Sequence, residues 1–312
     1  MKILVTGGCG YKGSVLVPKL LNQGHHVIVV DIMWFGNFLK PHPHLHVIHA
    51  DVRDIDASWF HQVDAIIHLA SVANDPCCEL NPKLTWEISA LATMQLADLA
   101  VREGVRQFIY ASSGSVYGVS DELQVTEETL LNPISEYNKA KMVAERVLLS
   151  YSKDIVMQIV RPATVCGYSP RMRLDVSVNM LTMQALSKKL ITVFGGDQTR
   201  PNIHIDDITD CYLFLLENKT PGIFNAGFEN LSIMDIAKTV ASFLPVEIKV
   251  SESNDPRSYR VNSDRLLNLG FKPKKTIKDA VKELIDYYHE GVLFDADRFY
   301  NIRTMKELKL AS

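Results

Sequence analysis

The sequence predicts an α/β fold, a Rossmann-type doubly wound parallel sheet with a smaller mixed lobe toward the C-terminus. Three observations predict it. Short apolar runs alternate with helical patterns through the first half of the chain, a glycine-rich turn follows the first apolar run, and an aspartate ends the second. Strands that alternate with helices in this way form parallel sheets whose faces the helices cover.

The bulk properties are those of an ordinary globular protein. The chain has 312 residues, of which 47% are hydrophobic and 22% charged, and a formal net charge of -3. This charge gives no basic field for nucleic acid, and no apolar run approaches the ~20 residues of a membrane span. The chain starts in an apolar run without a basic leader, so we expect no signal peptide. Five cysteines without metal-ligand spacing predict reduced thiols in a cytoplasmic protein.

The first strand–helix–strand unit predicts a dinucleotide site. Residues 2–6 form the first expected strand, and Gly7, Gly10 and Gly13 lie in the turn before the next helical pattern. Glycines let the backbone approach a pyrophosphate that sits at a helix N-terminus. The second expected strand ends at Asp31, where a carboxylate accepts hydrogen bonds from an adenosine ribose and repels a 2′-phosphate. The unit therefore predicts NAD rather than NADP.

Three further strands are expected to end at the same edge of the sheet. The carboxyl ends of parallel strands meet there, and ligands of doubly wound folds bind there. His68 lies inside one of these apolar strands and is expected to be a core histidine rather than a catalyst. The strands at 47–50, 64–69 and 106–113 end at Asp51-Val52, at Leu69-Ala70-Ser71 and at Ser112-Ser113.

Two other groups of residues are not expected to form sites. Histidines alternate between positions 42 and 49 beside two prolines, and no cysteine or carboxylate completes a ligand set, so we predict no metal. The adjacent Cys77 and Cys78 are interpreted as loop residues that precede a long helix over 82–103.

The segment from Tyr137 to Lys141 opens a helix that we expect over 135–153. A spacing of four residues places the Tyr137 phenol and the Lys141 ammonium on one face, a turn apart. Tyrosine titrates near pH ~10, and a neighbouring cation favours its charged form. The pair therefore predicts a base that removes an alcohol proton while hydride leaves the carbon. Ser113, at the end of a strand, is placed to hold the same oxygen.

The later segments predict a small mixed lobe over the carboxyl edge of the sheet. Ser232 and Thr276 are expected helix N-caps, and Asp279 follows Thr276 by three residues. The segments around 155–168 and 200–230 are expected to return to the main sheet. The expected elements are helices at 175–188, 206–217, 232–243 and 276–289 and a strand at 190–194.

Taken together, these motifs resemble the extended short-chain dehydrogenase/reductases, the NAD-dependent nucleotide-sugar epimerases and dehydratases. The resemblance implies NAD as cofactor and a nucleoside-diphosphate sugar as substrate. It implies an NAD-binding domain over 1–170, with returns around 200–230, and a mostly substrate-binding lobe over 171–312. The matching segments are 6–13, Asp31, 51–52, 68–70, 112–118, Tyr137 with Lys141, 161–167 and 200–207, which span nearly the whole chain.

The resemblance also implies a set of site residues. Ser113, Tyr137 and Lys141 would be catalytic, with Lys141 also binding the nicotinamide ribose and lowering the pKa of Tyr137. The implied cofactor-binding residues are Gly7, Gly10, Tyr11, Lys12, Gly13, Asp31, Asp51, Val52, Leu69, Ala70, Ser71 and Pro162, together with Tyr137 and Lys141. The implied substrate-binding residues are Ser113, Ser115, Thr164, Asn179, Arg200 and Arg257. The two arginines suit a diphosphate because the guanidinium is planar and always charged.

Departures from the family pattern shape the predicted activity. Gly114 and Ser115 stand where the dehydratases place an Asp-Glu pair, so 4,6-dehydration is disfavoured, and Thr164 replaces an asparagine of galactose epimerases. We predict oxidation of a ring hydroxyl, at C4, by a sugar-nucleotide epimerase. The alternatives are an NAD-dependent 4-dehydrogenase or reductase, for example on a GDP-heptose in surface-polysaccharide synthesis, and a non-catalytic NAD-sensing module. The family often dimerises through two helices, here 82–103 and 135–153, so we expect a homodimer.

Overall fold

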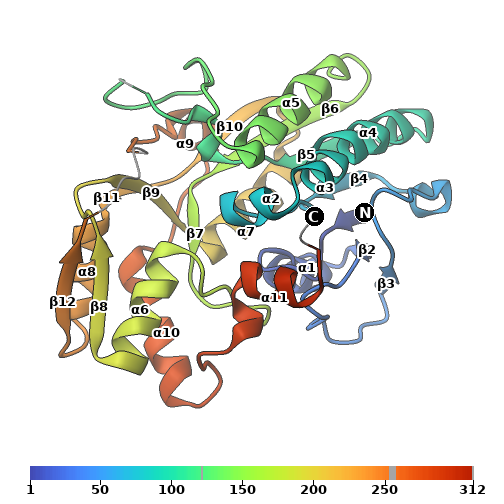
Figure 1. Cartoon of the computed structure of the whole chain (residues 1–312). Helices are drawn as coiled ribbons and strands as arrows, with labels where there is room; N and C mark the ends of the chain where they lie inside the picture. Colours follow the sequence, from blue (N-terminus) through green and yellow to red (C-terminus); the bar gives the residue numbers. More distant parts are fainter. Residues whose placement is uncertain (121, 253–257, 311–312) are drawn as a thin grey trace.

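A computed structural model describes residues 1–120, 122–252 and 258–310 of the chain (Figure 1). Its centre is a seven-stranded sheet in which every neighbouring pair of strands is parallel. The predicted Rossmann-type sheet is therefore confirmed. The strand order is β10 (Gly222–Ala226), β6 (Val156–Pro162), β5 (Gln107–Ala111), β4 (Ala65–His68), β1 (Lys2–Thr6), β2 (His26–Asp31) and β3 (Leu45–His49).

Helices cover both faces of this sheet (Figure 1). Side chains along a strand alternate between faces, so Ile3 and Val5 pack into one core and Leu4 packs into the other. The first core contains residues of α1 (Gly13–Asn22) and α7 (Ile205–Asn218). The second core contains residues of α4 (Ala92–Arg102) and α5 (Glu136–Ser150). The buried His68 belongs to the sheet and bonds Thr93 at 2.8 Å, which confirms the expected core histidine.

The segment before α4 differs from the sequence prediction. Cys77 and Cys78 lie in a short helix, α2 (Asp75–Leu80), and both are fully buried, so their assignment to a loop was wrong. Asn74 caps this helix from a φ of 74°, accepting a hydrogen bond from the Cys77 amide. The expected helix at 82–103 is also divided. It consists of α3 (Pro82–Trp86), the π-helical segment η2 (Glu87–Leu91) and α4.

The smaller lobe is built on two small sheets. In one, β8 (Leu190–Phe194) and β12 (Glu247–Ser251) pair in parallel. In the other, β9 (Thr199–His204) pairs in parallel with β7 (Thr164–Cys166) and antiparallel with β11 (Glu229–Ser232), so the lobe is mixed as predicted. The helices of the lobe are α6 (Ser177–Lys188), α8 (Ile233–Ala241) and α10 (Ile277–His289), and α9 (Asp264–Asn268) contacts β10.

The predicted helix caps of the lobe are confirmed. Ser232 accepts a hydrogen bond from the Asp235 amide at the start of α8. Thr276 and Asp279 form a reciprocal capping box at the start of α10. Both caps satisfy amide groups that a helix N-terminus leaves without partners.

The last described segment returns to the first half of the chain. Helix α11 (Asn301–Glu307) contacts α2, and the Leu310 carbonyl accepts a hydrogen bond from Asn81 at 3.2 Å. All five cysteines are buried free thiols. Within the described residues, no helix combines the length and the apolar character that crossing a bilayer requires.

Candidate active site

A cleft of about 440 Å³ opens at the carboxyl edge of the central sheet. It brings together most of the residues that the sequence singled out. Asn179 is not among its lining residues, and Arg257 lies outside the described residues. The predicted residues that line it are Gly7, Gly10, Tyr11, Lys12, Gly13, Asp31, Asp51, Val52, Leu69, Ala70, Ser71, Ser113, Ser115, Tyr137, Lys141, Pro162, Thr164 and Arg200.

The glycine turn between β1 and α1 is packed too closely for side chains. Gly7 has a φ of +71°, and a Cβ there would lie 2.6 Å from the Ala70 nitrogen. A Cβ on Gly13 would lie 2.3 Å from the Gly8 carbonyl oxygen. The absence of side chains lets the backbone of the turn approach a ligand at the start of α1. This arrangement fits a pyrophosphate at the helix N-terminus.

Two carboxylates line the cleft, Asp31 at the end of β2 and Asp51 after β3. Asp31 accepts hydrogen bonds from the amides of Cys9 at 2.9 Å and Met33 at 2.7 Å. Burial raises the pKa of Asp31, and these hydrogen bonds oppose the rise. Asp51 forms an ion pair with Arg53 at 2.7 Å. Burial alone would raise the pKa of Asp51, but the contacts with Arg53 lower it below its ordinary value. The aromatic rings of Trp34 and Phe35, which the sequence analysis did not single out, line the cleft with them.

Tyr137 and Lys141 enter the cleft from the first turns of α5. Ser135 caps this helix by accepting a hydrogen bond from the Asn138 amide at 3.2 Å. The Lys141 ammonium donates a hydrogen bond to the Ala111 carbonyl at 2.8 Å and lies 4.7 Å from the centre of the Tyr110 ring. Burial lowers the pKa of Lys141 to about 7, with a further contribution from the charge of Lys12.

The titration of Tyr137 differs from the sequence expectation. Lys141 was expected to lower the pKa of the Tyr137 phenol. Instead, burial raises the pKa of Tyr137 above its ordinary value, and the Ser113 hydroxyl and the charge of Arg173 oppose the rise. Arg173 is thus a cation that lowers the pKa of Tyr137, whereas the Lys141 ammonium donates its hydrogen bond to the Ala111 carbonyl.

Hydroxyl groups lie beside the phenol. Ser113 is the last residue before a short 3-10 helix, η3 (Gly114–Tyr117), and its Oγ lies 2.7 Å from the Ser115 Oγ. Ser115 donates in turn to Asn138 Oδ1 at 2.6 Å. The chain therefore presents two adjacent hydroxyls at this point, with glycine between them and no carboxylate.

The predicted substrate-side residues fall into two groups. Arg200 on β9 and Thr164 on β7 line the cleft. Asn179 is fully buried behind the wall of the cleft. Its side chain binds the Gly167 amide at 2.9 Å and the Arg173 carbonyl at 2.9 Å, so it supports the loop between β7 and α6.

That loop carries cleft residues that the sequence analysis did not assign. Arg173 forms an ion pair with Asp175 at 2.8 Å, and Asn74 donates to the other oxygen of Asp175 at 2.9 Å. Arg171 stacks on Phe35 at 3.9 Å and donates to Asn301 of α11 at 2.6 Å. The run Arg171-Met172-Arg173 was visible in the sequence, but the partners of this loop are distant in the chain. Asn74 lies 101 residues before Asp175, and Asn301 lies 130 residues after Arg171.

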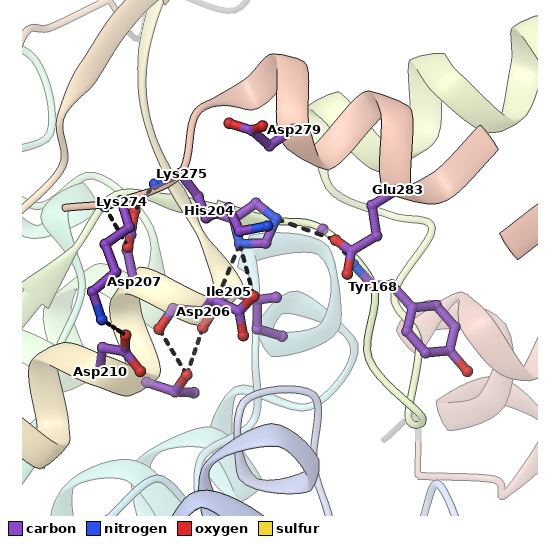
Figure 2. Close-up of polar contacts among 12 residues, drawn as sticks. Tyr168, His204, Ile205, Asp206, Asp207, Asp210, Lys274, Lys275, Asp279 and Glu283 are labelled. Atoms are coloured by element: carbon purple, nitrogen blue, oxygen red, sulfur yellow. Dashed lines mark hydrogen bonds and ion pairs between the residues drawn. The ribbon is translucent and has the colours of Figure 1, made fainter. Parts of the chain in front are cut away.

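Figure 2 shows Glu283 of α10 between His204 and Tyr168, the latter at the start of this loop. His204 Nδ1 accepts a hydrogen bond from the Asp206 amide at 3.1 Å, so the ring proton lies on Nε2. The Nε2–H then donates to Glu283 of α10 at 3.2 Å, and Glu283 also accepts the Tyr168 amide at 3.2 Å. One carboxylate thereby ties α10 to the start of α7 and to the loop that carries Arg173.

Comparison with known proteins adds independent findings. The family model described as the NAD dependent epimerase/dehydratase family matches residues 3–227. The chain is 32% identical over 301 residues to UDP-glucuronic acid decarboxylase 6 of Arabidopsis thaliana, covering 90% of this chain and 87% of that protein. It is 29% identical over 300 residues to a putative UDP-glucose 4-epimerase of Methanocaldococcus jannaschii, covering 91% and 97%.

Solved structures share the same architecture. One is a UDP-glucuronic acid 4-epimerase from Bacillus cereus in complex with UDP-glucuronic acid and NAD. It matches this chain with a TM-score of 0.81 and 26% identity, covering 93% of this chain and 99% of that one.

Proposed function

The chain belongs to the NAD-dependent epimerase/dehydratase family, and on that premise we propose that it is a nucleotide-sugar epimerase acting at C4. In this proposal the enzyme oxidises a ring hydroxyl of a nucleoside-diphosphate sugar and reduces the resulting ketone on its other face. The family predicted from the sequence motifs is confirmed. The observation that carries the proposal is that Ser113, Tyr137 and Lys141 line one cleft together with the glycine turn.

The residues present fit NAD. Gly7, Gly10 and Gly13 would hold the pyrophosphate at the start of α1, because the turn leaves no room for side chains. Asp31 would accept hydrogen bonds from the adenosine ribose, and Lys141 would bind the nicotinamide ribose. When bound, NAD supplies the hydride-transfer chemistry, and the protein supplies orientation and electrostatics.

The chain's own residues handle the proton. Tyr137 would accept the proton of the hydroxyl during oxidation and return it during reduction. The Ser113 hydroxyl would hold the same oxygen, since Ser113 interacts with the Tyr137 phenol. Burial favours the neutral phenol, so Tyr137 is well suited to the reductive half, in which it donates the proton.

An epimerase is favoured over a dehydratase by the segment around Ser113. Elimination of water from the sugar requires an acid and a base beside the keto group. Gly114 and Ser115 place no carboxylate there.

Arg173 favours a second candidate function, the decarboxylation of a nucleoside-diphosphate uronic acid. Its guanidinium acts on Tyr137 within the cleft and suits a carboxylate. A ketone at C4 makes the uronic acid carboxylate a β-keto acid, which loses carbon dioxide readily. The similarity to a protein named UDP-glucuronic acid decarboxylase 6 supports this candidate.

The test is product analysis with purified enzyme and a panel of UDP-, GDP- and dTDP-sugars that includes glucose and glucuronic acid. We expect a C4 epimer of unchanged mass, identified by NMR and mass spectrometry. Loss of carbon dioxide would favour the decarboxylase, and a keto sugar with reduced nicotinamide would favour a 4-dehydrogenase. If the protein bound NAD but converted none of these sugars, the enzyme proposal would be wrong and a non-catalytic NAD-sensing role would be favoured.

We propose further that the enzyme is a homodimer. Leu91 and Met94 lie at the end of η2 and the start of α4, with 53% and 39% of their surface exposed. A spacing of three residues places them on one face of the helix. Helix α5 packs beside α4, so two helices per subunit would meet their copies in a four-helix contact.

We place the enzyme in a reducing compartment such as the cytoplasm. Its five cysteines are buried as free thiols, which oxidising compartments disfavour. A disulfide found by mass spectrometry in protein from its native cells would contradict this placement.

A further inference from the structure

Lys12, the N-cap residue of α1, has an ammonium group for which the described part of the chain provides no counter-ion. The side chain lines the cleft, and its Nζ donates one long hydrogen bond of 3.4 Å to the Tyr212 hydroxyl. Among the described residues, no carboxylate forms an ion pair with it. By contrast, the ammonium of Lys19 on α1 lies 3.0 Å from Asp206 and 2.8 Å from Asp210.

This ammonium lies at the catalytic end of the cleft. Burial lowers the pKa of Lys141 most, and the charge of Lys12 makes the second largest contribution. Tyr212, which accepts the hydrogen bond from Lys12, is fully buried and interacts electrostatically with Tyr137. Burial and then the charge of Arg173 lower the pKa of Lys12 itself to about 8. All three side chains line the cleft, and Lys12 lies beside Tyr212, so we place Lys12 in the same region as Lys141 and Tyr137.

We infer that Lys12 sets the redox preference of the cofactor site by disfavouring the positively charged oxidised nicotinamide relative to the neutral reduced one. The inference rests on the proposed function, because Tyr137 and Lys141 mark the nicotinamide end of the cleft only if they have the roles proposed for them. Like charges repel strongly where water is excluded, and the neutral ring escapes this repulsion. The site then binds NADH more tightly than NAD⁺. This difference keeps the reduced cofactor bound while the ketone is present.

A phosphate ligand is the competing role for this lysine. The glycine turn, which has no room for side chains at Gly7 and Gly13, already lets the backbone approach a pyrophosphate. A lysine that held phosphate would contribute equally to the binding of NAD⁺, NADH and ADP-ribose, which all carry the same diphosphate. A lysine that acts on the nicotinamide ring would instead change the Kd for NAD⁺ relative to that for NADH, and it would not change the Kd for ADP-ribose.

The experiment compares wild-type enzyme, freed of co-purified cofactor, with Lys12→Met and Lys12→Arg. Titration calorimetry gives the Kd for NAD⁺, NADH and ADP-ribose. In Lys12→Met we expect the ratio of the NAD⁺ Kd to the NADH Kd to fall about tenfold, equivalent to about 1.4 kcal/mol. The Kd for ADP-ribose should stay unchanged, and Lys12→Arg should keep the wild-type ratio. Lys282→Met, at an ammonium on α10 that is 66% exposed, is the charge control and should leave all three values unchanged.

Two results would overturn the inference. Equal weakening of all three ligands in Lys12→Met would make Lys12 a phosphate ligand, and an unchanged ratio would leave it without influence on the ring. Circular dichroism melting of each variant establishes that the comparison is between folded proteins. Failure of the proposed function appears separately, since the wild-type enzyme would then bind neither dinucleotide or convert no nucleotide sugar.

Discussion

Among single residues, Tyr137 has the central role in the proposed reaction, because it would exchange the proton of the sugar hydroxyl. Its phenol lines the cleft and interacts with the Ser113 hydroxyl, so it is placed to exchange a proton with the substrate oxygen that Ser113 would hold. Tyr137→Phe should lower kcat at least about 100-fold, the lower range for loss of a general acid–base group. The Kd for NAD should stay near the wild-type value, because the ring remains. Tyr151→Phe, at the other end of the same helix, is the matched control, and wild-type kcat in Tyr137→Phe would exclude the phenol from the reaction.

Lys141 gives a prediction about stability and pH. Burial lowers its pKa in the folded protein to about 7 from an ordinary value of 10.5. Between these values the unfolded chain binds more protons than the folded one, so the free energy of unfolding rises with pH, by up to about 1.4 kcal/mol per unit. Below pH 7 the ammonium is charged in both states and its burial costs stability in full.

Lys141→Met removes that cost. The variant should therefore be more stable than the wild type near pH 7, and the difference should shrink as pH rises toward 10.5. Urea unfolding at several pH values measures it. A difference that stayed constant across this range would show that Lys141 does not change its protonation on folding.

The residue motifs could be predicted because each depends on a short stretch of sequence. A glycine turn, an aspartate at a strand end and a Tyr-Lys pair one turn apart are local patterns. Arg173 and Asp175 could not be assigned in this way, because their roles depend on Asn74 and Tyr137 from other segments. The pKa of Tyr137 was misjudged for the same reason, since burial is a property of the folded chain.

Among the elements, helix α5 is the one that carries the catalytic pair, and a buried ion pair anchors it. Glu145 on α5 lies 2.6 Å from Arg161 on β6, and their side chains are 1% and 3% exposed. Ser112 also donates a hydrogen bond to Glu145. Glu145→Ala leaves the Arg161 charge buried without its partner, which should cost about 3–5 kcal/mol of unfolding free energy.

Two further variants test this account of α5. Replacing both partners, as in Glu145→Leu with Arg161→Met, should recover much of the loss, because no buried charge remains. Asp286→Ala, in an exposed pair on α10, should cost at most about 1 kcal/mol. Denaturant unfolding measures all three, and a loss in Glu145→Ala no larger than that of Asp286→Ala would contradict the anchoring role.

The elements with regular periodicity were predicted well, and the irregular ones were not. The strand at 190–194 and the helix caps at Ser232 and Thr276 follow from apolar pattern and side-chain chemistry. Helix α2 was not predicted because it is only six residues long and begins after Asn74, whose φ is positive. The π-helical segment η2 has no sequence signal of its own and depends on packing against α5.

In the molecule as a whole, the cleft is assembled from segments that are distant in sequence. β10, from late in the chain, completes the edge of the central sheet, and α11 returns to contact α2. Asn301 at the start of α11 binds Arg171, which lines the cleft. The cleft therefore requires the complete fold, and a truncation before α11 would expose one of its walls.

The exposed face of η2 and α4 leads to a prediction about the oligomeric state of the protein. Leu91 and Met94 are exposed on one helix face beside α5, and contact with a second copy would remove both from water. Stable interfaces bury about 1,200–2,000 Å² in total, an area that two helices per subunit can supply. Leu91→Glu with Met94→Lys should therefore shift the protein from dimer to monomer in analytical ultracentrifugation, because charges at the centre of such a contact are left without solvent. Leu123→Glu, at a leucine that is 93% exposed in a loop, should leave the dimer intact. A monomeric wild type, or a dimer that survives the double substitution but not Leu123→Glu, would move the interface away from these helices.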